Sequence, residues 1–252
     1  MPDLLQELKA LSPFPPMDVA FSPEREWKNV YRIWTCHGYR ESGNANRGFL
    51  TVERKNRGSK TGFTLTVNQT IANDQKIRQS LSAEMECRAD ALASPVRWKL
   101  SSRFTGPDGR EIADLQRDEE AKVDGEVVNV LVNGNRFQRK VTGPWTSDWC
   151  LLESIQRLPF KKQVPAVFCM LEELSLSRPG HRIFYKGLYP LDIDAGKRSL
   201  HWFQQTGQGI LPYDYWIDES HRLMIMTTLS VVYILDEKAP EKVDQTEGDF
   251  DE

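Results

Sequence analysis

The sequence predicts a mainly β (α+β) protein: a curved antiparallel meander sheet, or half-barrel, of about ten strands wrapped around one or two short helices. Three observations support this fold class. Polar and apolar residues alternate along most of the chain, turn-forming residues separate the alternating segments, and helical spacing is strong in only one segment. Such alternation places one strand face in the core and the other in water, which is typical of antiparallel sheets.

The alternating segments begin near Trp27 and follow one another along the chain. The clearest spans residues 77–89, and segments 63–68 and 96–104 repeat its pattern. Its main inward-facing residues are Leu81, Ala83, Met85 and Cys87. Successive strand residues point to opposite faces, so each segment predicts a strand with one dry face.

Turn residues mark the joints between these strands. Asn133-Gly134 is the sharpest hairpin signal and joins residues 127–132 to residues 136–141. Asp218–Ser220 is expected to join residues 213–217 to residues 222–226. Asn56-Arg57-Gly58 and Pro107-Asp108-Gly109 are two further turns. Strands that are neighbours in sequence are therefore expected to be neighbours in the sheet.

Three segments have helical spacing. Thr146-Ser147-Asp148 supplies N-cap oxygens, and the apolar residues that follow predict a helix of about ten residues ending before Pro159. A weaker helical turn is expected at Phe168–Leu174, and residues 4–11 are a third candidate. The first of these helices is expected to cover the concave face of the sheet.

Length and composition favour one domain. The chain has 252 residues, with 33 basic and 36 acidic side chains and a net charge of -3. We expect an N-terminal arm at 1–26, a single half-barrel domain at 27–235 and an acidic disordered tail at 236–252. The charge lacks the basic excess of a nucleic-acid partner, and no apolar run is long enough to span a bilayer.

The four cysteines, at 36, 87, 150 and 169, contain no CxxC pair. This spacing argues against a cysteine metal site, and we expect no metal and no cofactor. Buried free thiols are favoured, while two disulfides are the alternative in an oxidising compartment. The N-terminus has no signal-peptide pattern, so either the protein is intracellular or a leader has been removed.

No residue pattern indicates catalysis, and we expect a protein that is not an enzyme. The histidines His37, His181, His201 and His221 show no metal-binding spacing. Adjacent Cys36 and His37 would point to opposite faces of a strand. Three further patterns are interpreted as a loop, a solvated turn and solvated carboxylates. They are Gly207–Gly209, the basic cluster Arg54, Lys55, Arg57 and Lys60, and the acidic pairs Asp192/Asp194 and Glu84/Glu86.

Four segments carry a resemblance to a known family. They are residues 145–159 (WTSDWCLLESIQRLP), 168–174 (FCMLEEL), 215–223 (YWIDESHRL) and 232–235 (VYIL). Together they resemble a family of exported bacterial domains of unknown function, which are similar to the outer-membrane lipoprotein-carrier half-barrels. The resemblance implies periplasmic or exported localisation if a signal peptide has been removed, and a hydrophobic ligand in the concavity. It implies no catalytic residues.

Two functions remain open at this point. The first is binding of a lipid or lipoprotein acyl chain in an aromatic-lined concavity. Its candidate ligand-binding residues are Phe63, Leu65, Leu81, Met85, Trp98, Leu100 and Trp202. The second is a protein-interaction or structural domain of the cell envelope, in which the helix fills the concavity and the same residues form a packed core.

Overall fold

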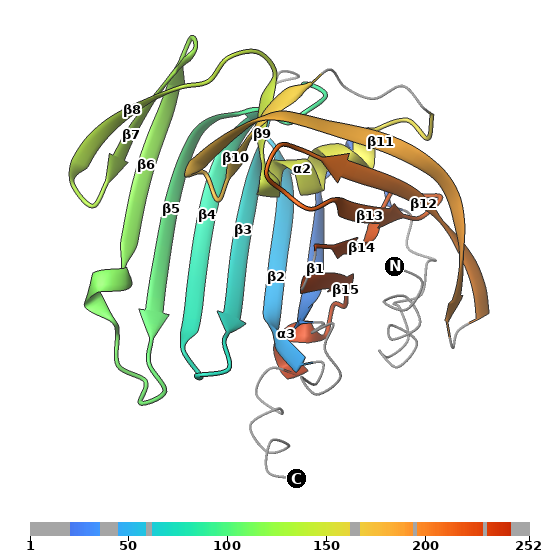
Figure 1. The fold of residues 1–252 in the computed structure, drawn as a ribbon, viewed down its shortest axis with the longest axis horizontal. Coiled ribbons are helices and arrows are strands. Elements are labelled where there is room, and N and C mark those ends of the chain that lie inside the picture. Colours follow the sequence, from blue (N-terminus) through green and yellow to red (C-terminus); the bar gives the residue numbers. More distant parts are fainter. Residues whose placement is uncertain are drawn as a thin grey trace.

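The computed structural model describes residues 21–35, 45–58, 62–161, 167–193, 196–228 and 231–242. The described strands form one 15-stranded sheet that curves into an open half-barrel (Figure 1). The predicted fold class is confirmed. The strand count exceeds the expected ten, and one of the additional strands is a segment predicted to be a helical turn.

The first wall of the half-barrel consists of eight consecutive strands. These are β1 (Trp27–Thr35), β2 (Ala45–Asn56), β3 (Gly62–Ala72), β4 (Arg78–Arg88), β5 (Pro95–Thr105), β6 (Arg117–Asp124), β7 (Val127–Val132) and β8 (Asn135–Lys140). A short 3-10 helix, η2 (Ala113–Leu115), precedes β6. The Asn133-Gly134 hairpin between β7 and β8 lies where the sequence predicts it.

The second part begins with the short strand β9 (Trp145–Ser147) and the helix α2 (Asp148–Ser154), which continues into η3 (Ile155–Arg157). The other strands are β10 (Phe168–Glu172), β11 (Leu176–Ile193), β12 (Gly196–Thr206), β13 (Tyr213–Ile217), β14 (Leu223–Thr227) and β15 (Val231–Leu235). The predicted turn at 218–220 joins β13 to β14.

The sheet runs in the order β8-β7-β6-β5-β4-β3-β2-β1-β15-β14-β13-β12-β11-β10-β9. Pairing of β1 with β15 joins the two parts of the chain into one surface. All neighbours are antiparallel except β9 and β10, which are parallel. Side chains bridge the gap between the two ends of the sheet: Arg117 donates to the Glu173 carbonyl at 3.3 Å and Arg139 to the Leu174 carbonyl at 2.9 Å.

Helix α2 lies inside the curve of the sheet (Figure 1). Together with η3 it covers Asp148–Arg157, the length predicted, and the Ser147 hydroxyl accepts a hydrogen bond from the Cys150 amide as an N-cap. Its side chains from Trp149 to Ser154 are buried against the sheet. This helix therefore covers part of the concave face. No helix of the described ranges has the length and apolar character needed to cross a membrane.

A buried ion pair fixes α2 to the sheet. Glu153 Oε1 accepts hydrogen bonds from Arg54 Nε at 3.0 Å and from Arg157 Nε at 2.9 Å. Arg54 was expected in a solvated basic turn, and that expectation is wrong, because β2 turns its side chain inward and only 4 % of the residue is exposed. Two other members of the predicted basic cluster, Lys55 and Arg57, remain near the surface. Arg57 forms an ion pair there with Glu86 at 2.5 Å.

Two other expectations change. Phe168–Leu174 forms a strand, not a helical turn, because its backbone pairs with β9 on one side and β11 on the other. The first residues of the predicted acidic tail contain the short helix α3 (Ala239–Lys242), in which Ala239 is buried. The candidate helix at residues 4–11 lies outside the described residues.

Candidate functional site

Six of the seven predicted ligand-binding residues lie together in the core. Phe63, Leu65, Leu81, Met85, Trp98 and Leu100 come from β3, β4 and β5, and none is more than 4 % exposed. All six belong to one packed hydrophobic cluster, and Leu100 also lines a surface depression described below. The seventh, Trp202 on β12, is half-buried and lies elsewhere, stacked on Trp216 with a ring-centroid distance of 6.5 Å. Binding by these residues stays a prediction.

A cavity of about 420 Å³ remains inside the half-barrel, between β10 and the strands β13, β14 and β15. We call it the tyrosine pocket. Its walls include Tyr213, Tyr215 and Tyr233, with the apolar side chains of Met170 and Met226. This volume lies within the usual range for small-molecule sites.

Strand register builds this wall. Tyr215 on β13 is paired with Met226 on β14, and Met226 is paired with Tyr233 on β15. Directly paired residues share a sheet face, so these three side chains form one row across three strands. Tyr213 lies two residues before Tyr215 and therefore faces the same side.

The floor of the tyrosine pocket is a buried hydrogen-bond chain. The Tyr215 hydroxyl donates to Gln205 Oε1 at 2.6 Å, and Gln205 Nε2 donates to His181 Nδ1 at 2.8 Å. This arrangement needs a neutral His181 that accepts at Nδ1, and burial correspondingly lowers the pKa of His181. The chain holds the Tyr215 hydroxyl in one direction.

The mouth of the tyrosine pocket is acidic. Asp148, at the start of α2, accepts hydrogen bonds from the amides of Trp149 and Glu173, each at 3.0 Å. Burial raises the pKa of Asp148 to about 7 despite these two bonds. Glu173 and Leu176 are exposed beside it, and 51 % of Leu176 is open to solvent.

The tyrosines are poor candidates for reaction chemistry. Burial raises the pKa of Tyr213, Tyr215 and Tyr233, so their hydroxyls stay protonated and act as hydrogen-bond donors. Of the other charged groups at the pocket, Arg117 is paired with Glu119 at 2.5 Å, and Glu172 is paired with Arg178 at 2.6 Å. The arrangement suits binding of a small molecule with apolar and hydrogen-bonding parts.

The described histidines do not assemble a metal site. His201 and His221 stack on opposite sides of Phe160, with centroid distances of 3.5 and 4.0 Å, and His181 is buried beside Gln205. Across the described ranges, no group of three or more His, Cys, Asp or Glu side chains is placed to hold a metal ion.

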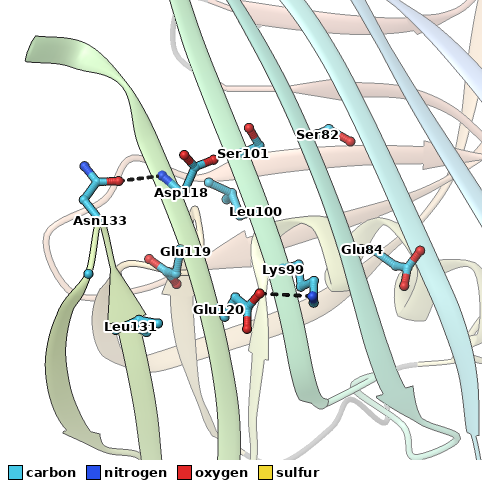
Figure 2. Close-up of a pocket in the computed structure, with 11 residues that line it drawn as sticks. Ser82, Glu84, Lys99, Leu100, Ser101, Asp118, Glu119, Glu120, Leu131 and Asn133 are labelled. Atoms are coloured by element: carbon cyan, nitrogen blue, oxygen red, sulfur yellow. Dashed lines mark hydrogen bonds and ion pairs between the residues drawn. The ribbon is translucent and has the colours of Figure 1, made fainter. Parts of the chain in front are cut away.

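A second depression, of about 470 Å³, lies on the solvent-facing side of β4–β7, opposite the core (Figure 2). Lys99 and Glu120 form an ion pair there at 3.0 Å, and the Asn133 side chain accepts a hydrogen bond from the Asp118 amide at 2.8 Å. Glu84, at its edge, is exposed, in agreement with its interpretation as a solvated carboxylate. Charges that already pair in open solvent make this a weaker candidate than the tyrosine pocket.

The remaining sequence candidates have structural roles or lie outside the described residues. Gly207 packs against the His181 ring, where an added Cβ would come within 2.7 Å, so the glycine serves close packing in a loop. Cys87, Cys150 and Cys169 are free and buried, as favoured. Cys36, His37, Lys60 and Asp194 lie outside the described residues, and the side chain of Asp192 is not described either.

Sequence reasoning missed the tyrosine pocket. Its lining comes from β6, α2, β10 and the five strands β11–β15, which no local pattern connects. The one available signal was the alternation of Tyr213 and Tyr215 within a segment already predicted to be a strand.

The fold defined by these elements is that of a β-barrel-like domain. Among solved structures, it is similar to the crystal structure of a β-barrel-like protein of the domain of unknown function DUF1849 from Brucella abortus. The TM-score is 0.55 and the sequence identity 12 %, over 84 % of this chain and 96 % of the other. No family model and no curated protein matches the chain. The similarity shows the fold alone.

Proposed function

We propose that this chain is a non-catalytic binding domain of the cell envelope that holds a hydrophobic group, such as a lipid acyl chain, in the tyrosine pocket. The observation that carries the proposal is the interior cavity of about 420 Å³ with tyrosine and methionine walls. Protonated tyrosine hydroxyls and paired charges provide binding contacts and no activated nucleophile.

The proposed site in the tyrosine pocket differs from the core residues that the sequence suggested. The apolar side chains of Met170 and Met226 suit the apolar part of a ligand, while the acidic mouth at Asp148 and Glu173 suits an uncharged polar or positively charged end. The exposed Leu176 at the mouth adds apolar surface where a chain would enter.

The first test is native mass spectrometry of the purified protein, followed by organic extraction of any bound molecule. A reproducible fatty-acid or phospholipid mass supports the proposal. Affinity is then measured by titration with a dansyl-labelled fatty acid. Saturable binding is expected, and its absence together with an apo mass would overturn the proposal.

Two matched variants locate the site. Leu176→Asp places a charge at the pocket mouth, and we expect roughly tenfold weaker binding, since burial of a leucine side chain contributes about 1.5–3 kcal/mol. Leu188→Asp is the control, because Leu188 is 55 % exposed, similar to Leu176 at 51 %, and lies on the same strand. Equal losses in both variants would place the site elsewhere.

Export is part of the same proposal. It rests on the resemblance to exported half-barrel domains, and fractionation of the native host with an antibody against this chain tests it. Recovery with periplasmic or outer-membrane markers supports export, and recovery with cytoplasmic markers contradicts it.

A second candidate function is recognition of a protein at the free edge of the sheet. Among the described strands β8 pairs only with β7, and its Phe137 side chain is 51 % exposed. A trough of about 840 Å³ adjoins it, with the basic residues Arg97, Lys122 and Arg136. An extended segment with acidic and apolar side chains would fit this edge by adding a strand.

A photo-crosslinking residue at position 137, incorporated in the native host, tests this second function. The same residue at position 188 is the control, because Leu188 is also strongly exposed. A single protein adduct from position 137, mapped to an acidic extended segment, supports edge recognition. Identical adducts from both positions, or none, would contradict it.

A further inference from the structure

Two buried thiols meet where α2 contacts the sheet. Cys87 is on β4 and Cys150 is in the first turn of α2, and their Sγ atoms are 3.6 Å apart. Cys150 is fully buried and Cys87 is only 3 % exposed. The two residues are 63 positions apart in the chain, so only the docking of α2 brings them together.

We propose that Cys87 and Cys150 form a disulfide that joins α2 to β4 when the chain folds under oxidising conditions. A disulfide has a bond length of about 2.0 Å, so the sulfur atoms would have to approach by about 1.6 Å from their present separation of 3.6 Å. Small rotations about χ1 of the two side chains supply a movement of that size.

The reaction balances with an external disulfide such as oxidised glutathione. One protein thiolate attacks a sulfur of oxidised glutathione and releases a first glutathione thiolate. The second protein thiol then loses its proton and attacks the protein sulfur of the mixed disulfide, which releases a second glutathione. Two protein thiols are oxidised to one disulfide, and one external disulfide is reduced to two thiols.

The third described cysteine has different surroundings. The Cys169 sulfur contacts the Ser177 hydroxyl at 3.1 Å. Of the three described thiols, only Cys87 and Cys150 have their sulfur atoms in contact with each other. Among the described thiols, the geometry therefore favours the pairing of Cys87 with Cys150.

Burial determines when the bond forms. Desolvation raises the pKa of the Cys87 thiol, with the neighbouring Cys150 acting in the same direction, so little thiolate is present in the folded protein. The thiolate is the species that attacks a disulfide, and both sulfurs are shielded from an external oxidant. We therefore expect the disulfide to form during folding. Once formed, it should resist reductants for as long as the chain stays folded.

Oxidative refolding of the full chain tests the proposal. The chain is unfolded with denaturant and reductant and then refolded either in a mixture of oxidised and reduced glutathione or in reductant alone. Both samples are denatured in iodoacetamide and analysed by intact and peptide mass spectrometry. We expect the oxidised sample to yield one linked peptide pair containing Cys87 and Cys150, with Cys169 alkylated.

Two variants act as matched controls. Cys169→Ala is expected to keep the linked pair, and the double variant Cys36→Ser/Cys169→Ala, which retains only the proposed partners, is expected to form it as well. The oxidised double variant should unfold at a higher temperature than its reduced form. Alkylation of Cys87 and Cys150 after refolding in the glutathione mixture, or linkage of either to another cysteine, would overturn the proposal.

Discussion

The contact between α2 and the sheet depends on a buried carboxylate, and Glu153→Gln tests how much. Glu153 is fully buried and accepts three hydrogen bonds from two guanidiniums, at 2.9–3.0 Å from Arg54 and Arg157. The variant preserves the shape of the side chain and removes its charge. Two arginines that are only 5 % and 10 % exposed are then left without their counterion.

Removing one partner of a buried ion pair usually destabilises a protein by about 3–5 kcal/mol. Arg54 keeps hydrogen bonds to the carbonyls of Glu24 and Arg25, at 2.8 and 2.7 Å, so we expect the lower end of that range. A loss of about 3 kcal/mol corresponds to a decrease in Tm of about 6–12 °C for a chain of this size.

The assay is urea unfolding followed by tryptophan fluorescence, because Trp149 and Trp98 lie in the core around α2. Glu120→Gln is the control. Its side chain is 57 % exposed in the ion pair with Lys99, and removal of such a pair changes stability by about 0–1 kcal/mol. If Glu153→Gln loses no more stability than Glu120→Gln, the reasoning about a buried ionic anchor is refuted.

Three further variants test other parts of the structure. The pKa of Asp148 is raised to about 7 from an ordinary 3.8, so the wild-type free energy of unfolding should fall as pH rises through that interval. Asp148→Asn should abolish this fall in urea titrations. An unchanged pH dependence of stability in the variant would contradict the raised pKa. Gly134→Ala places a side chain at φ 83° in the β7–β8 hairpin and should lower stability by about 1–2 kcal/mol in the same assay, whereas no loss would contradict the strain. Trp98→Phe removes the 2.7 Å hydrogen bond from the indole to Glu119 and should cost about 1–3 kcal/mol by thermal unfolding; a neutral effect would show that this bond contributes little.

The strands and turns of the first wall followed from the sequence because their signals are local. Alternation over residues 77–89 predicts β4, and the Asn133-Gly134 pair predicts its hairpin, since each depends on neighbours in the chain. The N-cap at Ser147 is equally local and locates α2. The prediction of a helical turn at Phe168–Leu174 was wrong, because a short apolar run suits either a helix or a strand. Pairing with β9 and β11 makes it a strand.

The candidate site was not predictable in the same way. The aromatic residues that the sequence suggested, such as Phe63 and Trp98, suit a ligand site and a packed core equally well. The structure buries them, with Arg54 over the Phe63 ring and Trp145 against Trp98. The tyrosine pocket instead combines Asp148 with Tyr213 and Tyr233, which come from separate elements. The alternation of side chains in the sequence shows which face of a strand is apolar. It does not show whether another element covers that face.

The sequence by itself determined the fold class, most strand positions and the helix inside the curve of the sheet, because backbone preferences and side-chain alternation act over a few residues. The tertiary structure alone decided which groups meet across the half-barrel. Arg54 and Glu153 are separated by 99 positions, and Cys87 and Cys150 by 63. Their contacts exist only because curvature of the sheet and docking of α2 bring distant segments together.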